Sequence, residues 1–274
     1  MRPKGRTALV TGATDGIGRL TTGRLADMGF TVLVHGRNAD RCAAVKAEIE
    51  QATGNPGIHT YAADLADLSK VRGLAAEIVE DHPRLDLLIN NAGIGPGPSG
   101  QGRSLSAQGY ELRLAVNYLA PFLLTHLLMP ALRKADSARI VNVSSAAQQA
   151  LDFDDVMLDR RYSPMRAYAQ SKLALTMFTF DLAEALHGES ITVNCLHPGS
   201  LLDTKMVREA FGTPQGRVES GAEAEVFLAT DPELEGISGK YFFEKRQSRA
   251  DAQAYDGNAR RRLRELSAEW VGLF

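Results

Sequence analysis

Short apolar runs alternate with longer amphipathic stretches along most of this 274-residue chain. The runs are rich in aliphatic and β-branched residues and almost uninterrupted, as expected of strands that helices cover on both faces of a parallel sheet. The pattern predicts strands at 7–11, 30–34, 58–64, 85–93, 138–145, 190–199 and 238–244, and helices at about 17–28, 39–53, 67–80, 106–133, 166–187 and 259–271. This order indicates an α/β fold with a doubly wound, parallel, seven-stranded sheet.

The chain shows no Pro/Ser-rich linker, so we expect residues 1–274 to form a single domain. The glycine-rich stretch 93–104 follows a predicted strand and is interpreted as a loop. A second irregular stretch, about 200–220, contains Gly212, Pro214 and Gly216. We predict that it is a mobile lid over the substrate.

Composition excludes several classes of function. A formal net charge of -2 gives no reason to expect nucleic acid or an anionic membrane as a partner. The first residues, MRPKGRTALVTG, resemble neither a signal peptide nor an anchor, and no uninterrupted apolar run approaches the roughly 20 residues that span a bilayer. Two cysteines, Cys42 and Cys195, are too few for a disulfide framework or a zinc cluster, which favours a reducing, cytoplasmic location.

The first predicted strand leads directly into the sequence TGATDGIG at 11–18 and then into a helix. Gly12 permits a tight turn, Gly16 lets the backbone approach a pyrophosphate, and Gly18 allows close packing of strand and helix. The helix N-terminus offers free N–H groups to phosphates, so we expect the loop, including Thr14, Asp15 and Ile17, to bind a dinucleotide. The alternative is a strand–helix turn without a ligand.

The second predicted strand ends in VLVHGRN, with Gly36 followed by Arg37. Enzymes that use NAD commonly place a carboxylate here to bind the ribose 2′-hydroxyl. A guanidinium at this position would instead bind a 2′-phosphate, so we predict NADP(H) in preference to NAD(H). The alternative is a solvated surface arginine, as Arg41 nearby illustrates.

Two further strand ends carry candidate cofactor residues. Asp64, followed by Leu65, closes the third strand and could accept a hydrogen bond from the adenine amino group. Asn91, Ala92 and Gly93 close the fourth strand, where small side chains allow the backbone to face a cofactor. Taken alone, each of these segments fits a strand-end turn equally well.

A tyrosine stands four residues before a lysine twice in this chain, as Tyr168–Lys172 and Tyr241–Lys245. Positions i and i+4 lie about 6 Å apart on one helix face but about 13 Å apart on a strand. Tyr168 begins a helical pattern, whereas Tyr241 lies in the predicted seventh strand. Only the first pair therefore fits catalysis, in which an adjacent ammonium should lower the pKa of the phenol. Ser145, at the end of the fifth strand, is placed to polarise a carbonyl group.

Together these residues resemble the short-chain dehydrogenase/reductase family, single-domain type. The matching motifs, in family order, are TGATDGIG at 11–18, NNAG at 90–93, Asn117 in AVNYLAPF, Ser145 in IVNVSS, YAQSK at 168–172 and PG at 198–199. The resemblance implies a Rossmann-type fold in which Lys172 also holds the nicotinamide ribose and Asn117 carries a proton relay through water. It also implies that Pro198 and Gly199 border the nicotinamide. Asn117 could instead be a helix-interior amide bonded to neighbouring backbone.

Two departures from the family pattern point to one branch of it. Ser145 and Tyr168 are 23 residues apart, and the extra segment carries Asp152, Asp154, Asp155 and Asp159. Their irregular spacing without histidines favours a solvated loop over a metal site, so no metal is expected. The insert and the C-terminal sequence resemble the retinol-dehydrogenase-like branch. The chain lacks that branch's hydrophobic N-terminal anchor, so we expect a soluble relative.

On the substrate side, HPGSLLDTKM at 197–206 leads into the predicted lid, and Thr204 stands one residue later than is usual in the family. Met206, Val207 and Phe211 could face an apolar substrate, although at helical spacing such residues more often pack internally. The C-terminal helix combines an apolar stripe with four arginines. We expect it to pack on its own domain or on a partner subunit rather than on a membrane.

We conclude that the sequence predicts an NADP(H)-dependent oxidoreductase that interconverts an apolar carbonyl compound and an alcohol, with Tyr168 as acid/base. The alternative from another class is a catalytically silent NADP(H)-binding regulatory protein. A sugar-nucleotide epimerase or dehydratase on the same fold would need a larger C-terminal substrate domain. The sequence leaves open the substrate, the direction, the stereochemistry and the question of a homo-oligomer.

Overall fold

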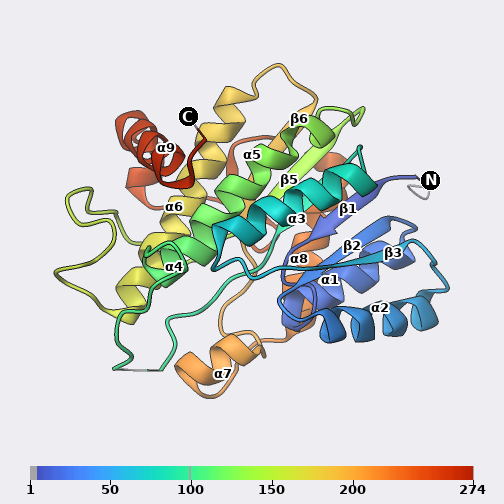
Figure 1. Ribbon diagram of the computed structural model, residues 1–274, viewed down its shortest axis with the longest axis horizontal. Coiled ribbons are helices and arrows are strands. Elements are labelled where there is room, and N and C mark those ends of the chain that lie inside the picture. Colours follow the sequence, from blue (N-terminus) through green and yellow to red (C-terminus); the bar gives the residue numbers. More distant parts are fainter. Residues whose placement is uncertain (1–4, 99, 274) are drawn as a thin grey trace.

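The computed structural model describes residues 5–98 and 100–273. Its centre is a twisted sheet with the strand order β3-β2-β1-β4-β5-β6-β7-β8 (Figure 1). The strands are β1 (Thr7–Val10), β2 (Thr31–Gly36), β3 (Ile58–Ala62), β4 (Leu87–Asn90), β5 (Ala138–Val143), β6 (Ile191–His197), β7 (Lys240–Phe243) and β8 (Arg246–Ser248). Strands β1 to β7 are parallel, and β8 pairs with β7 in the antiparallel direction.

The predicted doubly wound α/β fold is confirmed, with one correction to the number of strands. The three residues of β8 are polar and exposed, so they carry no hydrophobic pattern from which a strand could be predicted. They add an edge strand to the seven-stranded parallel sheet.

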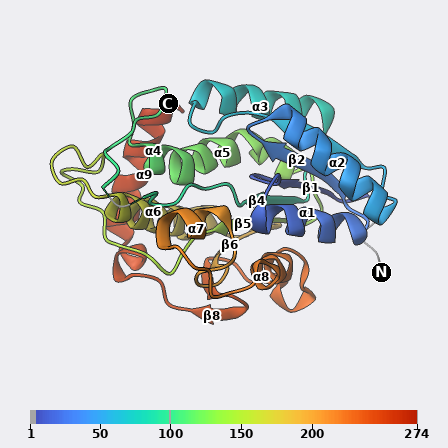
Figure 2. The same cartoon turned by 90° about the horizontal axis from the view of Figure 1, so that it is seen from below.

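Helices cover both faces of the sheet. The helical elements are α1 (Gly16–Asp27), α2 (Ala39–Thr53), α3 (Leu68–Asp81), α4 (Leu112–Leu114), the π-helical turn η1 (Ala115–Leu119), α5 (Ala120–Leu132), α6 (Pro164–Ala185), α7 (Lys205–Phe211), α8 (Val218–Thr230), the short 3₁₀ turns η2 (Pro232–Leu234) and η3 (Ala252–Tyr255), and α9 (Gly257–Val271). Helices α3 and α5 lie above the strands in Figure 2, and α1 and α8 lie below them. Helices α7 and α8 occupy a stretch that the sequence pattern treats as irregular.

The burial of successive strand residues explains the continuous apolar runs. Leu9 of β1 packs with α3, α5 and α6, whereas its neighbours Ala8 and Val10 pack with α1 and α8. Because both sheet faces are covered, residues on both faces must be apolar.

The long apolar helix between β4 and β5 forms part of the core. Its stretch Leu112–Leu132 is long and apolar enough to cross a membrane, yet most of it is buried inside the domain. The helix begins at Leu112 rather than at the predicted residue 106, because Glu111 accepts a hydrogen bond from Leu114 N and caps the first turn.

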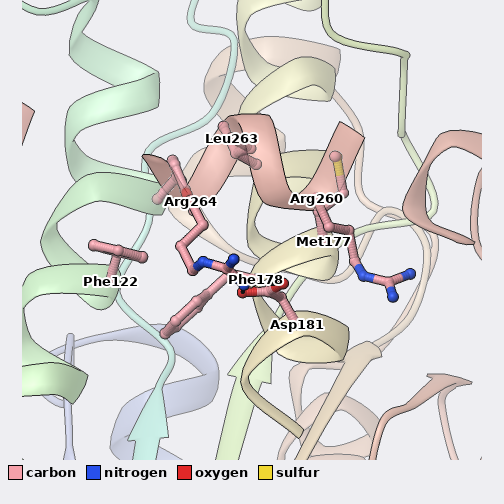
Figure 3. Close-up of a pocket in the computed structure, with 8 residues that line it drawn as sticks. Phe122, Met177, Phe178, Asp181, Arg260, Leu263 and Arg264 are labelled. Atoms are coloured by element: carbon pink, nitrogen blue, oxygen red, sulfur yellow. Dashed lines mark hydrogen bonds and ion pairs between the residues drawn. The ribbon is translucent and has the colours of Figure 1, made fainter. Parts of the chain in front are cut away.

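Helix α9 packs against α6 through the apolar stripe that the sequence predicts, with Leu263 only 1% exposed. Three of its four arginines, Arg260, Arg262 and Arg264, pair with acidic side chains of the same chain. Figure 3 shows Arg264 directed toward Asp181 of α6, and the two side chains approach to 2.9 Å. Arg260 pairs with Glu184, one turn further along α6. In this structure the basic face of α9 is therefore engaged with its own domain.

Helices α1 and α8 meet around a buried carboxyl group. Glu225 is fully buried, and its Oε2 accepts a hydrogen bond of 2.7 Å from the Thr21 hydroxyl. Its Oε1 finds no hydrogen-bond partner within the described residues. Burial raises the pKa of Glu225 to about 8, against the opposing effects of the Thr21 hydrogen bond and the Lys172 charge.

We expect Leu263→Ala to lower the free energy of unfolding by about 2–4 kcal/mol, because it leaves a cavity between α9 and α6. Arg261→Ala on the exposed side of the same helix is the control and should change it by no more than about 0.5 kcal/mol. Urea denaturation of both variants checks this. Equal effects would mean that α9 does not stabilise the domain.

We also expect Glu225→Gln to change how stability depends on pH. The folded-state pKa of Glu225 is raised from 4.5 to about 8, so this group's contribution to stability falls as pH rises between those values. Glutamine cannot titrate, so the urea midpoint of Glu225→Gln should fall less between pH 5.5 and pH 8 than that of the unsubstituted protein. The exposed Glu223→Gln on the same helix is the control, and an unchanged pH profile in Glu225→Gln would contradict the assignment.

Candidate active site

The glycine-rich loop after β1 closes against the end of β4. A Cβ atom on Gly18 would lie 2.3 Å from Asn91 Nδ2 and 2.5 Å from the Gly12 carbonyl oxygen. A Cβ atom on Gly12, whose φ is +66°, would lie 2.8 Å from Ala92 Cα. Both positions therefore require glycine, and the backbone of the loop stays bare at the N-terminus of α1.

Hydrogen bonds hold this loop in place from two sides. Asn91 Nδ2 donates to Thr11 O at 2.7 Å, and Ala92 N donates to Thr11 Oγ1 at 3.0 Å. On the other side, His35 of β2 accepts from Gly12 N at 3.4 Å and contacts Ala63 O through Nε2 at 3.1 Å. Burial lowers the pKa of His35 to about 4, so a neutral ring can accept at Nδ1 and donate at Nε2.

His35 is a site residue that the sequence interpretation missed. Its only signal is a polar side chain inside the apolar run VLVHG, which by itself is equally typical of a buried structural histidine. It ties the ends of β1, β2 and β3 together.

The remaining cofactor candidates also lie along the carboxyl edge of the sheet. Arg37 is exposed just beyond β2, and Asp64 is exposed after β3, where its carboxylate accepts from Ala66 N at 3.0 Å. Leu65 is buried beside it, as is Pro198 after β6. Gly199 follows Pro198 with a φ of +138°, a conformation that favours glycine.

A second arginine, Arg41, contacts the glycine-rich loop at residues 11–18 directly. Arg41 Nη2 donates to Thr14 O at 3.2 Å and lies 3.3 Å from the carboxylate of Asp15. Asp15 in turn caps α1 by accepting from Gly16 N at 2.8 Å. Arg41 is exposed, as the sequence interpretation expects, and its guanidinium also contacts the loop.

The fold brings Ser145, Tyr168 and Lys172 together from β5 and α6. Both Tyr168 and Ser145 are less than 10% exposed, and the Ser145 side chain lies close enough to the Tyr168 phenol to act against the rise of its pKa. Lys172 Nζ lies 5.9 Å from the centre of the Tyr168 ring and donates to Val143 O at 2.8 Å. The two Tyr–Lys pairs therefore differ in geometry. Lys172 lies beside the Tyr168 ring, whereas Lys245 lies beyond β7, away from Tyr241, and pairs with Glu223.

The electrostatics of this cluster differ from the expectation that Lys172 lowers the pKa of Tyr168. Burial raises the pKa of Tyr168, and the nearby Ser145 side chain opposes this only in part. Burial also lowers the pKa of Lys172 to about 8, against the attraction of the Glu225 carboxyl group. The phenol is not activated in this state because desolvation dominates and the ammonium group is directed to the Val143 carbonyl.

Asn117 lies at the centre of the π-helical turn η1 and binds the chain that leaves β4. Its Oδ1 accepts from Ile94 N at 2.8 Å, while Nδ2 donates to Ile94 O at 3.0 Å and to Ser171 Oγ at 2.9 Å. The side chain therefore bonds to neighbouring backbone, as the structural alternative predicts. π-Helical turns of this kind often occur at functional sites.

Tyr241 contributes more than sheet packing. Its hydroxyl donates to Ser145 O at 3.1 Å, and Gln148 Nε2 donates to the same carbonyl at 2.8 Å. The second Tyr–Lys match therefore places its tyrosine directly behind the candidate catalytic serine. The sequence gives no signal for this role, because β6 and β7 must first pair to bring Tyr241 there.

The segment between Ser145 and Tyr168 is solvated only in part: Asp152, Asp154 and Asp159 are exposed, as the sequence suggests, but several of its other residues are buried. Leu151, Val156 and Leu158 are buried in the core, and the carboxylate of Asp155 accepts from Asp159 N at 2.8 Å. Asp155 is thus a turn-capping residue. The residues that the structure describes contain no group of three His, Cys, Asp or Glu side chains suited to a metal ion.

The predicted lid contacts both the phosphate loop and the β4 end. Thr204 caps α7 by accepting from Val207 N at 3.3 Å, and its methyl group would lie 3.5 Å from a Cβ atom on Gly16. Met206 lies against Gly95, where a Cβ atom would come within 2.6 Å of Met206 Cγ.

Comparison with known proteins identifies the family. The family model described as short chain dehydrogenase matches residues 6–215. Human retinol dehydrogenase 13 is 37% identical over 98% of this chain and 85% of its own length, and mouse polyprenol dehydrogenase is 38% identical over 94% and 82%.

Solved structures agree with this result. A short chain dehydrogenase from Escherichia coli CFT073, complexed with NADPH, has a TM-score of 0.73 and 30% identity, covering 88% of this chain and 97% of its own. An uncharacterized protein from Mycobacterium paratuberculosis has a TM-score of 0.79 and 28% identity, with 98% and 94% covered. With its Rossmann fold, its glycine-rich loop and these relatives, the chain belongs to the short-chain dehydrogenase/reductase family of nicotinamide-dependent oxidoreductases, in the retinol-dehydrogenase-like branch.

Proposed function

We propose that this protein is an NADP(H)-dependent oxidoreductase that interconverts a carbonyl compound and an alcohol, with Tyr168 as the acid/base. The observation that supports this most directly is that the buried side chains of Ser145, Tyr168 and Lys172 lie together at the carboxyl edge of the sheet. Two hydroxyl groups placed together there can bind one substrate oxygen. A silent regulatory protein would need only the phosphate loop.

The residues present fit a nicotinamide dinucleotide. Gly12 and Gly18 leave the backbone bare at the N-terminus of α1, where phosphate groups can accept hydrogen bonds from N–H groups. When bound, the nicotinamide supplies or accepts the hydride, which no side chain can do. We assign the loop residues 12 and 14–18, together with Asp64, Leu65, residues 91–93, Pro198 and Gly199, to binding this cofactor.

The chain's own residues perform the remaining steps. Ser145 orients the substrate carbonyl by donating a hydrogen bond, and Tyr168 donates the proton that the alkoxide oxygen needs during reduction. In the direction of oxidation the same phenol accepts that proton. Tyr241 and Gln148 fix the backbone of Ser145, so its hydroxyl does not have to be ordered when substrate binds.

Lys172 supports this chemistry as a cation. Its pKa of about 8 leaves most of the ammonium charged at neutral pH, and it lies on the same helix face as Tyr168. A positive charge near a phenol favours the phenolate form. We also assign to Lys172 the contact with the nicotinamide ribose, and to Asn117 a part in the proton relay.

The end of β2 supports a preference for NADP(H). A Cβ atom on Gly36 would lie 2.5 Å from Thr14 Cγ2, so this position has no room for a carboxylate that would bind a ribose 2′-hydroxyl. Arg37 follows, exposed, and Arg41 lies against the same loop. Two guanidinium groups at this point favour a 2′-phosphate.

For the substrate we propose an apolar alcohol or carbonyl compound. Met206 and Val207 of α7 and Ile94 after β4 are apolar and only half-buried on this side of the molecule. The relatives named retinol dehydrogenase and polyprenol dehydrogenase act, by their names, on apolar alcohols. A cytoplasmic location is part of the proposal and is supported by two buried cysteines without a disulfide bond.

We expect Tyr168→Phe to lower kcat by about 10²–10⁴-fold, because it removes the proton donor, while the dissociation constant of NADPH changes little. NADPH oxidation with a panel of aldehydes, ketones and quinones measures this. The matched control is Tyr241→Phe, which removes a buried hydroxyl next to the site and should keep kcat within about tenfold. Near-normal turnover by Tyr168→Phe would contradict the assignment.

We expect Arg37→Asp to lower the NADPH/NADH ratio of kcat/KM by at least about tenfold, because a carboxylate repels the 2′-phosphate and accepts from the ribose hydroxyl. Arg133→Asp, an exposed arginine at the opposite edge of the sheet, is the control and should leave the ratio unchanged. An unchanged ratio in both variants would remove Arg37 from the cofactor site.

A further inference from the structure

Arg113 is a buried arginine that the mechanism above does not use. It stands on α4 and is only 2% exposed. Each of its five N–H groups has an acceptor. Nε donates to Gly95 O at 3.1 Å, and Nη1 donates to Tyr162 Oη at 2.7 Å and to Glu111 Oε1 at 3.4 Å. Nη2 donates to Pro96 O and, at 3.2 Å, to Gln101 Oε1. A guanidinium group offers five donors in a fixed plane, so its geometry is fully used here.

Two of these bonds continue a series that begins at the catalytic cluster. A Cβ atom on Gly93 would lie 3.2 Å from Lys172 Nζ, which places the end of the NNAG motif beside the lysine. Asn117 then binds both backbone groups of Ile94, and Arg113, one helical turn earlier, binds the carbonyls of Gly95 and Pro96. Three consecutive residues leaving the cluster are thus held by two side chains of one helix.

Arg113 also connects this backbone to the segment inserted between Ser145 and Tyr168. Tyr162 lies at the end of that segment, and its hydroxyl accepts the hydrogen bond from Arg113 Nη1. On its other side Gly95 receives Met206 of α7. Arg113 therefore lies where the β4 loop, the inserted segment and the predicted lid meet.

We propose that Arg113 is a positioning residue that fixes residues 94–98 and Tyr162 as one wall of the substrate pocket and thereby determines which carbonyl compounds the site accepts. The selectivity part of this inference rests on the proposed oxidoreductase function. Arg113 acts through the backbone and through Tyr162, and it does not touch the reacting atoms.

The charge of Arg113 is compensated where it is buried. Glu111 is 1% exposed, and its other oxygen, Oε2, accepts from Leu114 N at 2.8 Å. Removing the arginine charge would leave this buried carboxylate without its cationic partner, which is strongly destabilising. Lysine keeps the charge but has three donors on a single nitrogen, so it cannot reach all five acceptors.

The test compares Arg113→Lys and Tyr162→Phe with the unsubstituted protein, using NADPH and two aldehydes, decanal and propanal. Loosening the wall should lower kcat/KM for decanal by about tenfold or more in Arg113→Lys, mainly through KM, and by less than about threefold for propanal. Tyr162→Phe removes one bond of five and should change the decanal/propanal ratio in the same direction by a smaller factor. NADPH affinity should stay within about twofold.

The control is Arg139→Met, because Arg139 is a half-buried arginine that also donates to two carbonyls, those of Leu228 and Asp231, but at the amino edge of the sheet. It should lower stability and leave the decanal/propanal ratio unchanged. The proposal is overturned if that ratio also stays constant in both Arg113→Lys and Tyr162→Phe. If Arg113→Lys does not fold, the ratio in Tyr162→Phe decides alone.

A second readout separates this inference from the proposed function. Hydrogen exchange of the NADPH-bound protein should become faster at the amides of Ile94, Gly95 and Gly97 and in residues 152–162 of Arg113→Lys, and it should stay unchanged in α1. If the unsubstituted protein reduces no aldehyde at all, the proposed function fails. The exchange measurement alone then shows whether Arg113 fixes residues 94–98 and Tyr162. Unchanged exchange in both segments would then overturn the positioning role of Arg113.

Discussion

The close approach of the β1 and β4 ends is the contact on which the rest of the site depends. Gly12 and Gly18 lack the side chains that would push these ends apart, and Asn91 uses its amide group to bond them together. This contact sets the direction of α1 and exposes its N-terminal N–H groups. It also fixes where Gly93 emerges, beside Lys172. The cofactor loop and the catalytic cluster are therefore positioned by the same few atoms.

Burial determines the chemistry of the cluster that results. It raises the pKa of Tyr168 and lowers the pKa of Lys172, so both groups are shifted toward their neutral forms before anything binds. A site of this kind requires additional favourable interactions to form a phenolate. Such a requirement is consistent with our proposal that Tyr168 donates its proton to the substrate oxygen during reduction.

Positioning in this site relies on side chains bonded to backbone carbonyls. Tyr241 and Gln148 hold Ser145, Asn117 holds Ile94, and Arg113 holds Gly95 and Pro96. Each donor is buried or half-buried, where a hydrogen bond competes little with water. The backbone around Ser145, Tyr168 and Lys172 is thus fixed by one motif residue, Asn117, and by three residues outside the recognised motifs, Tyr241, Gln148 and Arg113.

The sequence by itself determined the order of strands and helices, the glycine positions of the phosphate loop and the family motifs. These features are local, because periodicity, backbone freedom and spacing can be judged over a few residues. Only the tertiary structure decided the short polar strand β8, the core packing of the 146–162 segment, and the roles of His35, Arg41, Arg113 and Tyr241. Their partners lie on other strands and helices, up to 96 residues away for Tyr241 and Ser145, so no local pattern records them.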